Sequence, residues 1–312
     1  MKVYDIVNNF KDATDNFELG RSRYWFVLTS GELENIKDLI LIDEESIKEC
    51  ENVGQAAQIN FYDGYIFITL NVLNYNEKLV EADEFNIFLS KDYIITVFKK
   101  DLVLTKDLLF DIKASKNCFI LRDIPRPCIL LYYILDRVVL NNYVVISELE
   151  QIGDEIEINI LGNANHEQIE ELINLRRQVY SMRKYLNPLR YIGDSLIGND
   201  NLIIDSRYIL YFEKINNKID KLMLAFDSLV NDLALVREAF ESEIGNKTNE
   251  LLKVFTLIAT IFLPLNLLTS LHGMNVMDTP FSGIRYGFYY IIIIMISISL
   301  FLVFLFKKKK WL

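Results

Sequence analysis

Two long apolar stretches near the C-terminal end constrain this chain more than any other feature of its sequence. The first covers residues 251–271, with Lys253 as its one charged residue, and the second covers residues 286–306 without a charge. At 1.5 Å per residue, about 20 helical residues span the roughly 30 Å of hydrocarbon in a bilayer. Because a core helix of a soluble domain rarely stays apolar over this length, the sequence predicts two membrane-spanning helices joined by a short loop.

The charges beside these stretches predict their orientation. Four lysines follow the second stretch directly: Lys307, Lys308, Lys309 and Lys310. The connecting loop carries only Asp278 and Arg285. Because positively charged flanks stay on the cytoplasmic side, we expect a multi-pass protein of the cell membrane with both termini in the cytoplasm.

The chain as a whole is acidic, which bears on its partners. Its formal net charge is −10, and the C-terminal lysines make the preceding part more negative still. Such a charge argues against a nucleic-acid partner. It has two other interpretations, a protein that attracts cations or simply a soluble acidic surface, and it fits both equally well. The sequence has no glycine-rich phosphate motif and only two histidines, so we expect no nucleotide, no prosthetic group and no enzyme.

Residues 1–125 alternate between strand-like and helical patterns. Runs of β-branched and aromatic residues, bounded by Asp-Gly and Ser-Lys-Asp turns, predict strands. These runs lie at residues 26–30, 59–73, 84–90 and 92–98. Helical spacing at residues 32–42 and 45–57 completes the pattern of a cytoplasmic α/β/α domain. The three cysteines show no ligand spacing and are expected to be reduced, mostly buried thiols.

Residues 126–250 have the apolar spacing of helices. Pro188 is expected to interrupt a helix or to begin the next turn, and the polar run at residues 198–201 predicts a break. Helical spacing resumes near Asp205 and continues into the first apolar stretch, which predicts a stalk helix of about 60 residues. The apolar stripe of this helix is expected to pack against copies of itself, and in part against the helices of residues 128–190.

A chain with two spans has too little membrane mass to enclose an ion pathway alone, so conduction needs several copies. The first span is the better candidate for the lining, because polar and small residues recur along it at steps of three and four and share one helix face. This face consists of Asn249, Leu252, Thr256, Ala259, Leu263, Asn266, Ser270 and Gly273. An amide such as that of Asn266 is costly against lipid, so it lines a wet lumen or makes a hydrogen bond between helices.

These predictions describe an α+β membrane protein with a long stalk helix and two C-terminal transmembrane helices per subunit. Its expected parts are an α/β domain at residues 1–125, a helical region with the stalk at 126–250, a pore-lining helix at 251–272, an extracytoplasmic loop at 273–285, a second, lipid-facing transmembrane helix at 286–306 and a basic tail at 307–312.

The residues directly after the first span, Gly273-Met274-Asn275 in the string IFLPLNLLTSLHGMNV, resemble the Gly-Met-Asn signature of the CorA family of magnesium and cobalt channels. Three residues alone are weak evidence, but KTNELLKVFTLIATIF before the span and KKKKWL at the end of the chain agree with the family. Farther upstream, LLYYILD with its following Asn-Tyr pair, LRRQVYSMRKYLNP and SKDYIITVF resemble other segments of the family. The likeness covers most of residues 60–312.

The resemblance implies a homopentamer with a funnel-shaped cytoplasmic domain, in which the first span lines the pore. Asn275 with Gly273, on either side of Met274, would form a ring of oxygens at the outer mouth. Because Mg²⁺ gives up its water reluctantly, such a ring suits the hydrated ion. Positions that line the pore in the family fall on Asn249, Leu263 and Asn266. Mg²⁺ is then both the transported ion and a regulatory ion that acts through the cytoplasmic domain.

Several positions depart from the family pattern. His272 stands where the family usually has Tyr, and is either a metal ligand or a packing residue. Asn266 replaces a residue that is commonly Thr, and Asp278 is the only carboxylate of a loop that is usually more acidic, which predicts weaker gathering of cations. At a position where a regulatory Asp is found, this chain has Lys214 beside Glu213, so the regulatory sites do not transfer.

Two other functions fit parts of the sequence. A zinc or other transition-metal transporter of the same superfamily is favoured by His272 and by the less acidic loop. A membrane-anchored sensor without conduction belongs to another class of protein, and the polar face of the first span argues against it.

Overall fold

The computed structural model describes residues 1–40, 42–100, 103–114, 116–274, 280, 285–309 and 311. The chain divides into two compact units. The first unit contains Met1–Asn159 and Asn165–Arg237, and the second contains Ile160–Ala164 and Glu238–Leu312.

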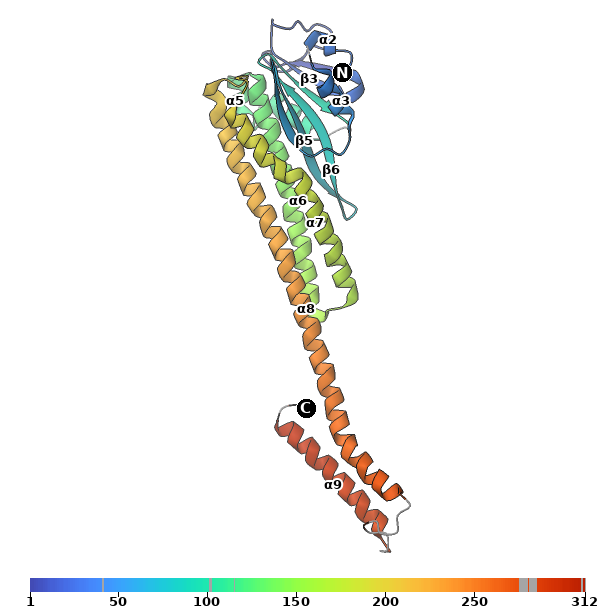
Figure 1. Cartoon of the computed structure of the whole chain (residues 1–312). Helices are drawn as coiled ribbons and strands as arrows, with labels where there is room; N and C mark the ends of the chain where they lie inside the picture. The colour runs from blue at the N-terminus through green and yellow to red at the C-terminus, as the bar shows by residue number, and fades with distance from the viewer. Residues whose placement is uncertain are drawn as a thin grey trace. The chain divides into compact units, whose positions relative to one another are not determined.

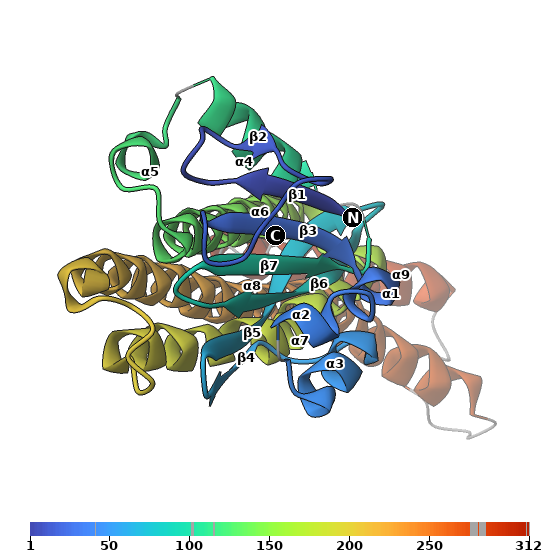
Figure 2. The same ribbon diagram turned by 90° about the horizontal axis from the view of Figure 1, so that it is seen from above.

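A seven-stranded sheet with the order β2-β1-β3-β7-β6-β5-β4 forms the centre of the first unit (Figure 2). Its strands are β1 (Lys2–Asp5), β2 (Lys11–Asp12), β3 (Tyr24–Thr29), β4 (Gln58–Tyr62), β5 (Tyr65–Asn76), β6 (Leu79–Leu89) and β7 (Tyr93–Phe98). Only β3 and β7 are parallel neighbours, and the other pairs are antiparallel. The predicted strands are confirmed. Residues 59–73 divide into β4 and β5 because Gly64, with a φ of 89°, turns the chain between them.

Three short helices cover one face of the sheet, as the position of α2 and α3 in Figure 1 shows. They are α1 (Ser30–Leu33), α2 (Lys37–Ile40) and α3 (Glu44–Glu51). Leu33, Ile36 and Ile47 from this layer share a buried apolar cluster with Phe26 and Phe67 of the sheet. The prediction of a helix through residue 57 is wrong, because α3 ends at Glu51 and polar side chains of the sheet bind the following backbone.

Two of these polar contacts hold residues 52–57 in a non-helical path. The backbone N–H of Gln55 donates to Glu84 Oε2 (2.8 Å), and Asn71 Nδ2 donates to the carbonyl of Gln55 (3.3 Å). A backbone N–H and C=O that are used in this way are not free for helical hydrogen bonds.

Longer helices cover the other face of the sheet (Figure 1). The helices that follow the sheet are α4 (Val103–Lys113), α5 (Phe119–Asp123), α6 (Pro127–Asn163), α7 (His166–Gly198), the 3₁₀ turn η1 (Ser206–Tyr208), α8 (Ile209–Gly273) and α9 (Gly287–Lys308). The long stalk helix is confirmed as α8, which has 65 residues. Pro188 neither ends nor begins a helix, because it lies inside α7. Its neighbours Leu186 and Leu189 are buried, and this packing outweighs the hydrogen bond that proline removes.

The first part of α8 buries its apolar stripe within the same chain. The stripe residues are at most 2 % exposed: Phe212, Ile215, Ile219, Leu222, Phe226, Leu229 and Leu233. A Cβ on Gly153 of α6 would come within 3.0 Å of Leu233 Cδ2, so the two helices approach closely there. The prediction that this stripe packs against the chain's own helices is therefore confirmed. This packing takes the place of packing against copies for these residues.

Side-chain amides of α6 close the open edge of β5. β4 pairs with β5 only as far as Thr69. Beyond that point, Asn142 Oδ1 accepts from the backbone N–H of Leu73 (2.9 Å), and Asn142 Nδ2 donates to the carbonyl of Asn71 (3.2 Å). Asn141 Nδ2 donates to the carbonyl of Leu73 (2.6 Å). The Asn142 carboxamide thus continues the ladder of backbone hydrogen bonds where β4 stops.

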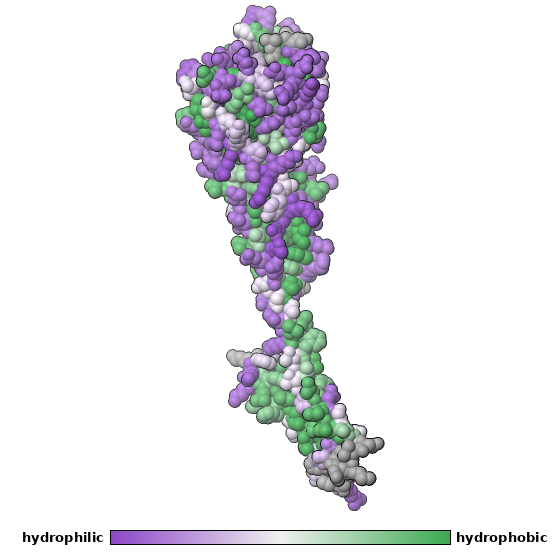
Figure 3. All heavy atoms as spheres, viewed as in Figure 1, coloured by the Kyte–Doolittle hydropathy of each residue, from purple (hydrophilic) through white to green (hydrophobic). Residues whose placement is uncertain are grey.

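Three helices in the described part of the chain are long and apolar enough to cross a membrane: Pro127–Gly162, Ser206–Gly273 and Gly287–Lys308. In the first of them, 61 % of the most apolar window is buried within the chain, against 6 % and 0 % in the other two. The apolar residues of α6 therefore serve the core of the first unit. The surface over α9 and the C-terminal part of α8 is mostly hydrophobic (Figure 3), as expected for the two C-terminal spans.

Candidate functional site

The C-terminal part of α8 presents two different faces. Leu257 is 8 % exposed, and Ile261, Leu265, Leu268 and His272 are half-buried. Half-buried residues recur along α9 at the same spacing, among them Ile291, Met295, Ile298, Leu302 and Leu305. Each helix therefore covers one stripe of the other within the second unit.

The predicted pore-lining face lies on the opposite side of α8. All of its members are exposed: Asn249, Leu252, Thr256, Ala259, Leu263, Asn266, Ser270 and Gly273. At about 100° per residue, the centre of this face lies roughly 180° from the stripe that contains Leu257, Ile261 and Leu268. The spacing in the sequence therefore identifies a face of α8 that α9 leaves uncovered.

The spacing of this uncovered face has a further geometric consequence. Its members alternate steps of three and four residues, which is a repeat of seven. On a straight helix such a repeat drifts by about 20° per heptad. Copies of α8 that meet along the whole face would therefore supercoil with a left-handed twist.

Polar groups on this face are of two kinds. The Thr256 hydroxyl donates to the carbonyl of Leu252 (2.7 Å), so it is satisfied within its own helix. The Asn266 carboxamide makes no hydrogen bond to any residue that the structure describes, and it does not face α9. In a membrane this carboxamide needs a hydrogen-bond partner, since a bare amide in hydrocarbon is costly.

Only part of the proposed outer mouth lies in the described residues. Gly273 ends α8, and Met274 follows with 56 % of its surface exposed. Asn275 and Asp278 lie outside the described residues. Both ring nitrogens of His272 face carbonyl oxygens, Nδ1 that of Leu268 (2.9 Å) and Nε2 that of Pro280 (3.0 Å). This geometry favours the packing interpretation of His272 over metal ligation, because neither nitrogen is free.

The basic tail follows directly on the helix. Lys307 and Lys308 form the last turn of α9, and Lys309 caps it with its backbone N–H. All three side chains are exposed, whereas Lys310 lies outside the described residues. Lysines in a last helical turn interact favourably with the negative end of the helix dipole.

Metal-ligating side chains are not clustered in the described part of the chain, where no three His, Cys, Asp or Glu residues are grouped around one point. The uncovered face of α8 instead offers neutral amide, hydroxyl and backbone oxygens. Because Mg²⁺ gives up its water reluctantly, neutral oxygens of this kind suit contact with the hydrated ion.

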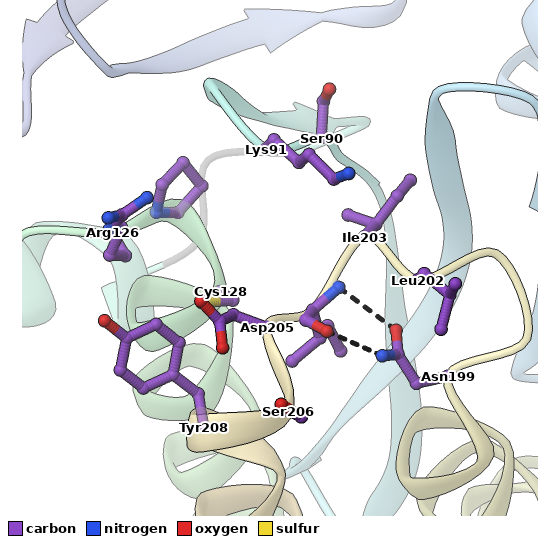
Figure 4. Close-up of a pocket in the computed structure, with 12 residues that line it drawn as sticks. Ser90, Lys91, Arg126, Cys128, Asn199, Leu202, Ile203, Asp205, Ser206 and Tyr208 are labelled. Atoms are coloured by element: carbon purple, nitrogen blue, oxygen red, sulfur yellow. Dashed lines mark hydrogen bonds between the residues drawn. The ribbon is translucent and has the colours of Figure 1, made fainter.

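A cavity of 450 Å³ in the first unit was not predicted from the sequence (Figure 4). Its wall combines the turn between β6 and β7, the start of α6 and the connection from α7 to α8. The cationic residues of this wall are Lys91 and Arg126. In the sequence, the available signal for this cavity was that Lys91 and Arg126 stand at turn positions of an acidic chain. The two residues are far apart in the sequence, so nothing in it indicates that their segments meet.

Comparison with known proteins agrees with the fold. The sequence profile of the CorA-like Mg²⁺ transporter protein family matches residues 22–308. The cobalt/magnesium transport protein CorA of Thermotoga maritima is 28 % identical over 284 residues, which are 90 % of this chain and 78 % of the relative. The zinc transport protein ZntB of Vibrio parahaemolyticus is 27 % identical over 135 residues, which are 43 % of this chain and 41 % of the relative.

Solved structures share the fold over the full length. The CorA magnesium transporter from Methanocaldococcus jannaschii superposes with a TM-score of 0.81 at 18 % identity, covering 100 % of this chain and 98 % of that one. The full-length CmaX protein gives a TM-score of 0.76 at 19 % identity, covering 99 % and 97 %. The arrangement of an α/β domain, a long helix and C-terminal apolar helices is therefore shared with these proteins.

Proposed function

Because the chain belongs to the CorA-like Mg²⁺ transporter family, a family of divalent-cation transporters, we propose that it is a channel for Mg²⁺ uptake with a homo-oligomeric pore. Co²⁺ and Ni²⁺ are further proposed substrates. The relatives named for cobalt and magnesium transport and for magnesium transport support this choice of ions.

The observation that carries the proposal is the uncovered face of α8. One side of the helix is covered by α9, and the opposite side presents Asn249, Thr256, Asn266 and Ser270. If this side faced lipid, the carboxamide of Asn266 would stay without a partner in hydrocarbon. If it faces a water-filled lumen between copies of the chain, each polar group is hydrated and α9 lies toward the lipid.

The number of copies and the filter follow from the family resemblance. We propose a pentamer in which Asn275 and Gly273 form the ring at the outer mouth and Leu263 forms a hydrophobic constriction. The lysines after α9 support an orientation with both termini in the cytoplasm. The membrane potential then drives uptake, because moving a 2+ charge inward gains about 4.6 kcal/mol per 100 mV. Gating by Mg²⁺ through the cytoplasmic domain is part of the proposal.

A pair of threonines one turn apart allows a matched test of the lining. Thr256 lies on the uncovered face and Thr260 lies about 80° away from its centre, yet both hydroxyls donate to carbonyls of their own helix at 2.7 Å. Mg²⁺ flux is measured in liposomes before and after a charged thiol reagent that enters only water-filled spaces. We expect the reagent to block Thr256→Cys and to leave Thr260→Cys and the wild type unchanged, because the native cysteines are buried. Equal block of both variants would refute the proposed lining.

The same liposomes separate the alternatives. If Asn275→Ala abolishes the Mg²⁺ flux, the result supports Asn275 as part of the filter. If the flux is unchanged in this variant, the filter assignment is wrong. Flux of Zn²⁺ without Mg²⁺ would identify a transition-metal transporter. If a well-folded oligomer moves neither ion, the sensor function takes the place of the channel.

A further inference from the structure

A groove between α6 and α8 in the first unit exposes apolar side chains to solvent. It has a volume of 510 Å³, and its apolar lining consists of Val139, Leu140 and Tyr143 from α6 and Leu222, Leu224 and Ala225 from α8. Leu140 is 63 % exposed and Leu224 is 65 % exposed. Exposed apolar side chains that gather in one place mark interaction surfaces. The groove is therefore a candidate docking surface.

The rim residue Leu224 belongs to the same heptad face of α8 as the predicted pore lining. The positions that continue this face in steps of three and four, from Gly245 back to Leu210, are all exposed. Helices that meet along a repeat of seven keep the same neighbours along their length. The proposed function places the C-terminal part of this face between copies of the chain. The groove at the edge of the face therefore points to the same partner, a second copy.

The two flanks of this face carry opposite charges. At about 100° per residue, Lys221 and Asp227, three residues before and after Leu224, lie roughly 60° to either side of it. The flank on the side of the groove carries Lys214, Lys218 and Lys221, and the other flank, which we call the acidic flank, carries Glu213, Asp220 and Asp227. Each copy therefore has a basic groove side and an acidic side along one helix.

One charge on each flank remains available to a partner. Lys218 already pairs with Asp136 of α6, and Asp220 pairs with Arg190 of α7. Lys221 and Asp227 are both exposed, and neither has an ion-pair partner among the residues that the structure describes. A second copy can supply that partner to each of them.

The symmetry of a ring brings these opposite flanks together. A cyclic oligomer joins two different patches head to tail, so that each copy contacts two neighbours. Around such a ring of α8 helices, the groove side of each copy faces the acidic flank of the next, and the charges attract. A two-fold contact through the groove would instead bring the lysines of both copies together.

We propose that the groove between α6 and α8 receives the acidic flank of α8 from a second copy in a head-to-tail ring. This inference rests on the proposed function, because it requires that copies of the chain surround the uncovered face of α8. Leu140 and Tyr143 then cover apolar surface of the neighbouring α8, and Lys221 faces Asp227 of the partner subunit. The contact joins the copies through the first unit, apart from the proposed lining.

Cross-linking of the full-length protein in detergent tests this contact. Leu140→Cys/Asp227→Cys places one thiol in the groove and one on the acidic flank, both at exposed positions, while the native cysteines are buried. After mild oxidation, electrophoresis without reductant should show a ladder from the dimer up to the complete ring, because each copy is linked to two neighbours. No cross-link, or a dimer and nothing larger, would overturn the proposal.

Matched controls show whether the ladder depends on this pair of positions. Each single variant has only one of the two thiols and should give no ladder. Val53 is 83 % exposed and lies outside the groove lining, so Val53→Cys/Asp227→Cys should give none either. An equal ladder from this control would overturn the proposal, because the cross-links would then reflect random collisions.

Charge reversal gives an independent test. Subunit exchange between labelled rings, followed by energy transfer, should become about two- to fivefold faster in Lys221→Glu and in Asp227→Lys, as expected for an exposed ion pair. The combined variant should return to the wild-type rate. Residues six apart on one helix do not face each other, so this restoration arises between copies. Single reversals without effect, or a combined variant that exchanges faster than either, would refute the contact.

Neither readout depends on Mg²⁺ flux, so the two proposals can fail separately. A ladder from a protein that moves no ion would support this contact and remove the channel. Flux through an intact ring that gives no ladder would support the channel and remove this contact.

Discussion

Replacing Asn142 by alanine should destabilise the first unit strongly, because this side chain replaces a missing strand. Asn142 is 0 % exposed, and it makes two hydrogen bonds with the backbone of β5, accepting from Leu73 N–H at 2.9 Å and donating to the Asn71 carbonyl at 3.2 Å. Two such bonds contribute about 1 kcal/mol each, and the buried N–H of Leu73 left without a partner costs about 1–3 kcal/mol. The expected loss in the free energy of unfolding is therefore about 3–5 kcal/mol.

Two further substitutions separate hydrogen bonding from packing. Asn142→Leu restores the side-chain volume without the hydrogen bonds, and it should lose nearly as much stability as Asn142→Ala. Asn141→Ala removes one bond, to the Leu73 carbonyl, from a half-buried position. Its expected loss is about 0.5–1.5 kcal/mol.

Chemical unfolding followed by the fluorescence of Trp25 measures these differences. Trp25 is 1 % exposed in the sheet, and the second tryptophan, Trp311, is removed in a Trp311→Phe background. If Asn142→Leu unfolds within about 0.5 kcal/mol of the parent protein, the hydrogen bonds do not carry the stability and the reasoning fails.

Three more predictions follow from the described contacts. Gly193→Ala should destabilise the first unit by less than about 1 kcal/mol, because its Cβ displaces the end of the Asn216 side chain while alanine favours the helix. Gly245→Ala, with open space around it, should be neutral or slightly stabilising in the same unfolding assay. Asp111 contacts Arg137, and this contact holds the pKa of the Asp111 carboxyl below its usual range. The ionised carboxylate therefore stabilises the fold above about pH 4, and this contribution is lost as the pH falls through the folded-state pKa. Between pH 7 and pH 3, Asp111→Asn should therefore lose less stability than the wild type loses. The three buried thiols should not react with a thiol reagent at pH 8 until the protein is denatured, and fast labelling of the native protein would contradict their burial.

The sequence alone predicted those elements whose signal is local. Alternating β-branched and aromatic residues identified the central strands, and the heptad spacing on α8 identified the face that α9 leaves uncovered. Both signals repeat over many residues of one segment. β1 and β2, with 4 and 2 residues, are too short to show a repeat.

Features that depend on contacts between distant segments were not predictable. The backbone of residues 52–57 leaves the helical path because Glu84 and Asn71 bind it, and no pattern within the segment reveals those partners. Pro188 suggested a helix end, but the buried residues around it keep α7 continuous. The cavity with Lys91 and Arg126 likewise exists only after the sheet and the helices have assembled.

The amide ladder between α6 and β5 also constrains how the chain is made. Leu73 and Asn142 are separated by 69 residues, so a ribosome that adds about 5–20 residues per second needs several seconds to supply the second after the first. During that interval the outer edge of β5 has no partner from α6, and an open strand edge invites pairing with other chains. The end of β5 contains Asn74 and Asn76 rather than further aliphatic residues, and these polar side chains disfavour intermolecular pairing until the helix arrives.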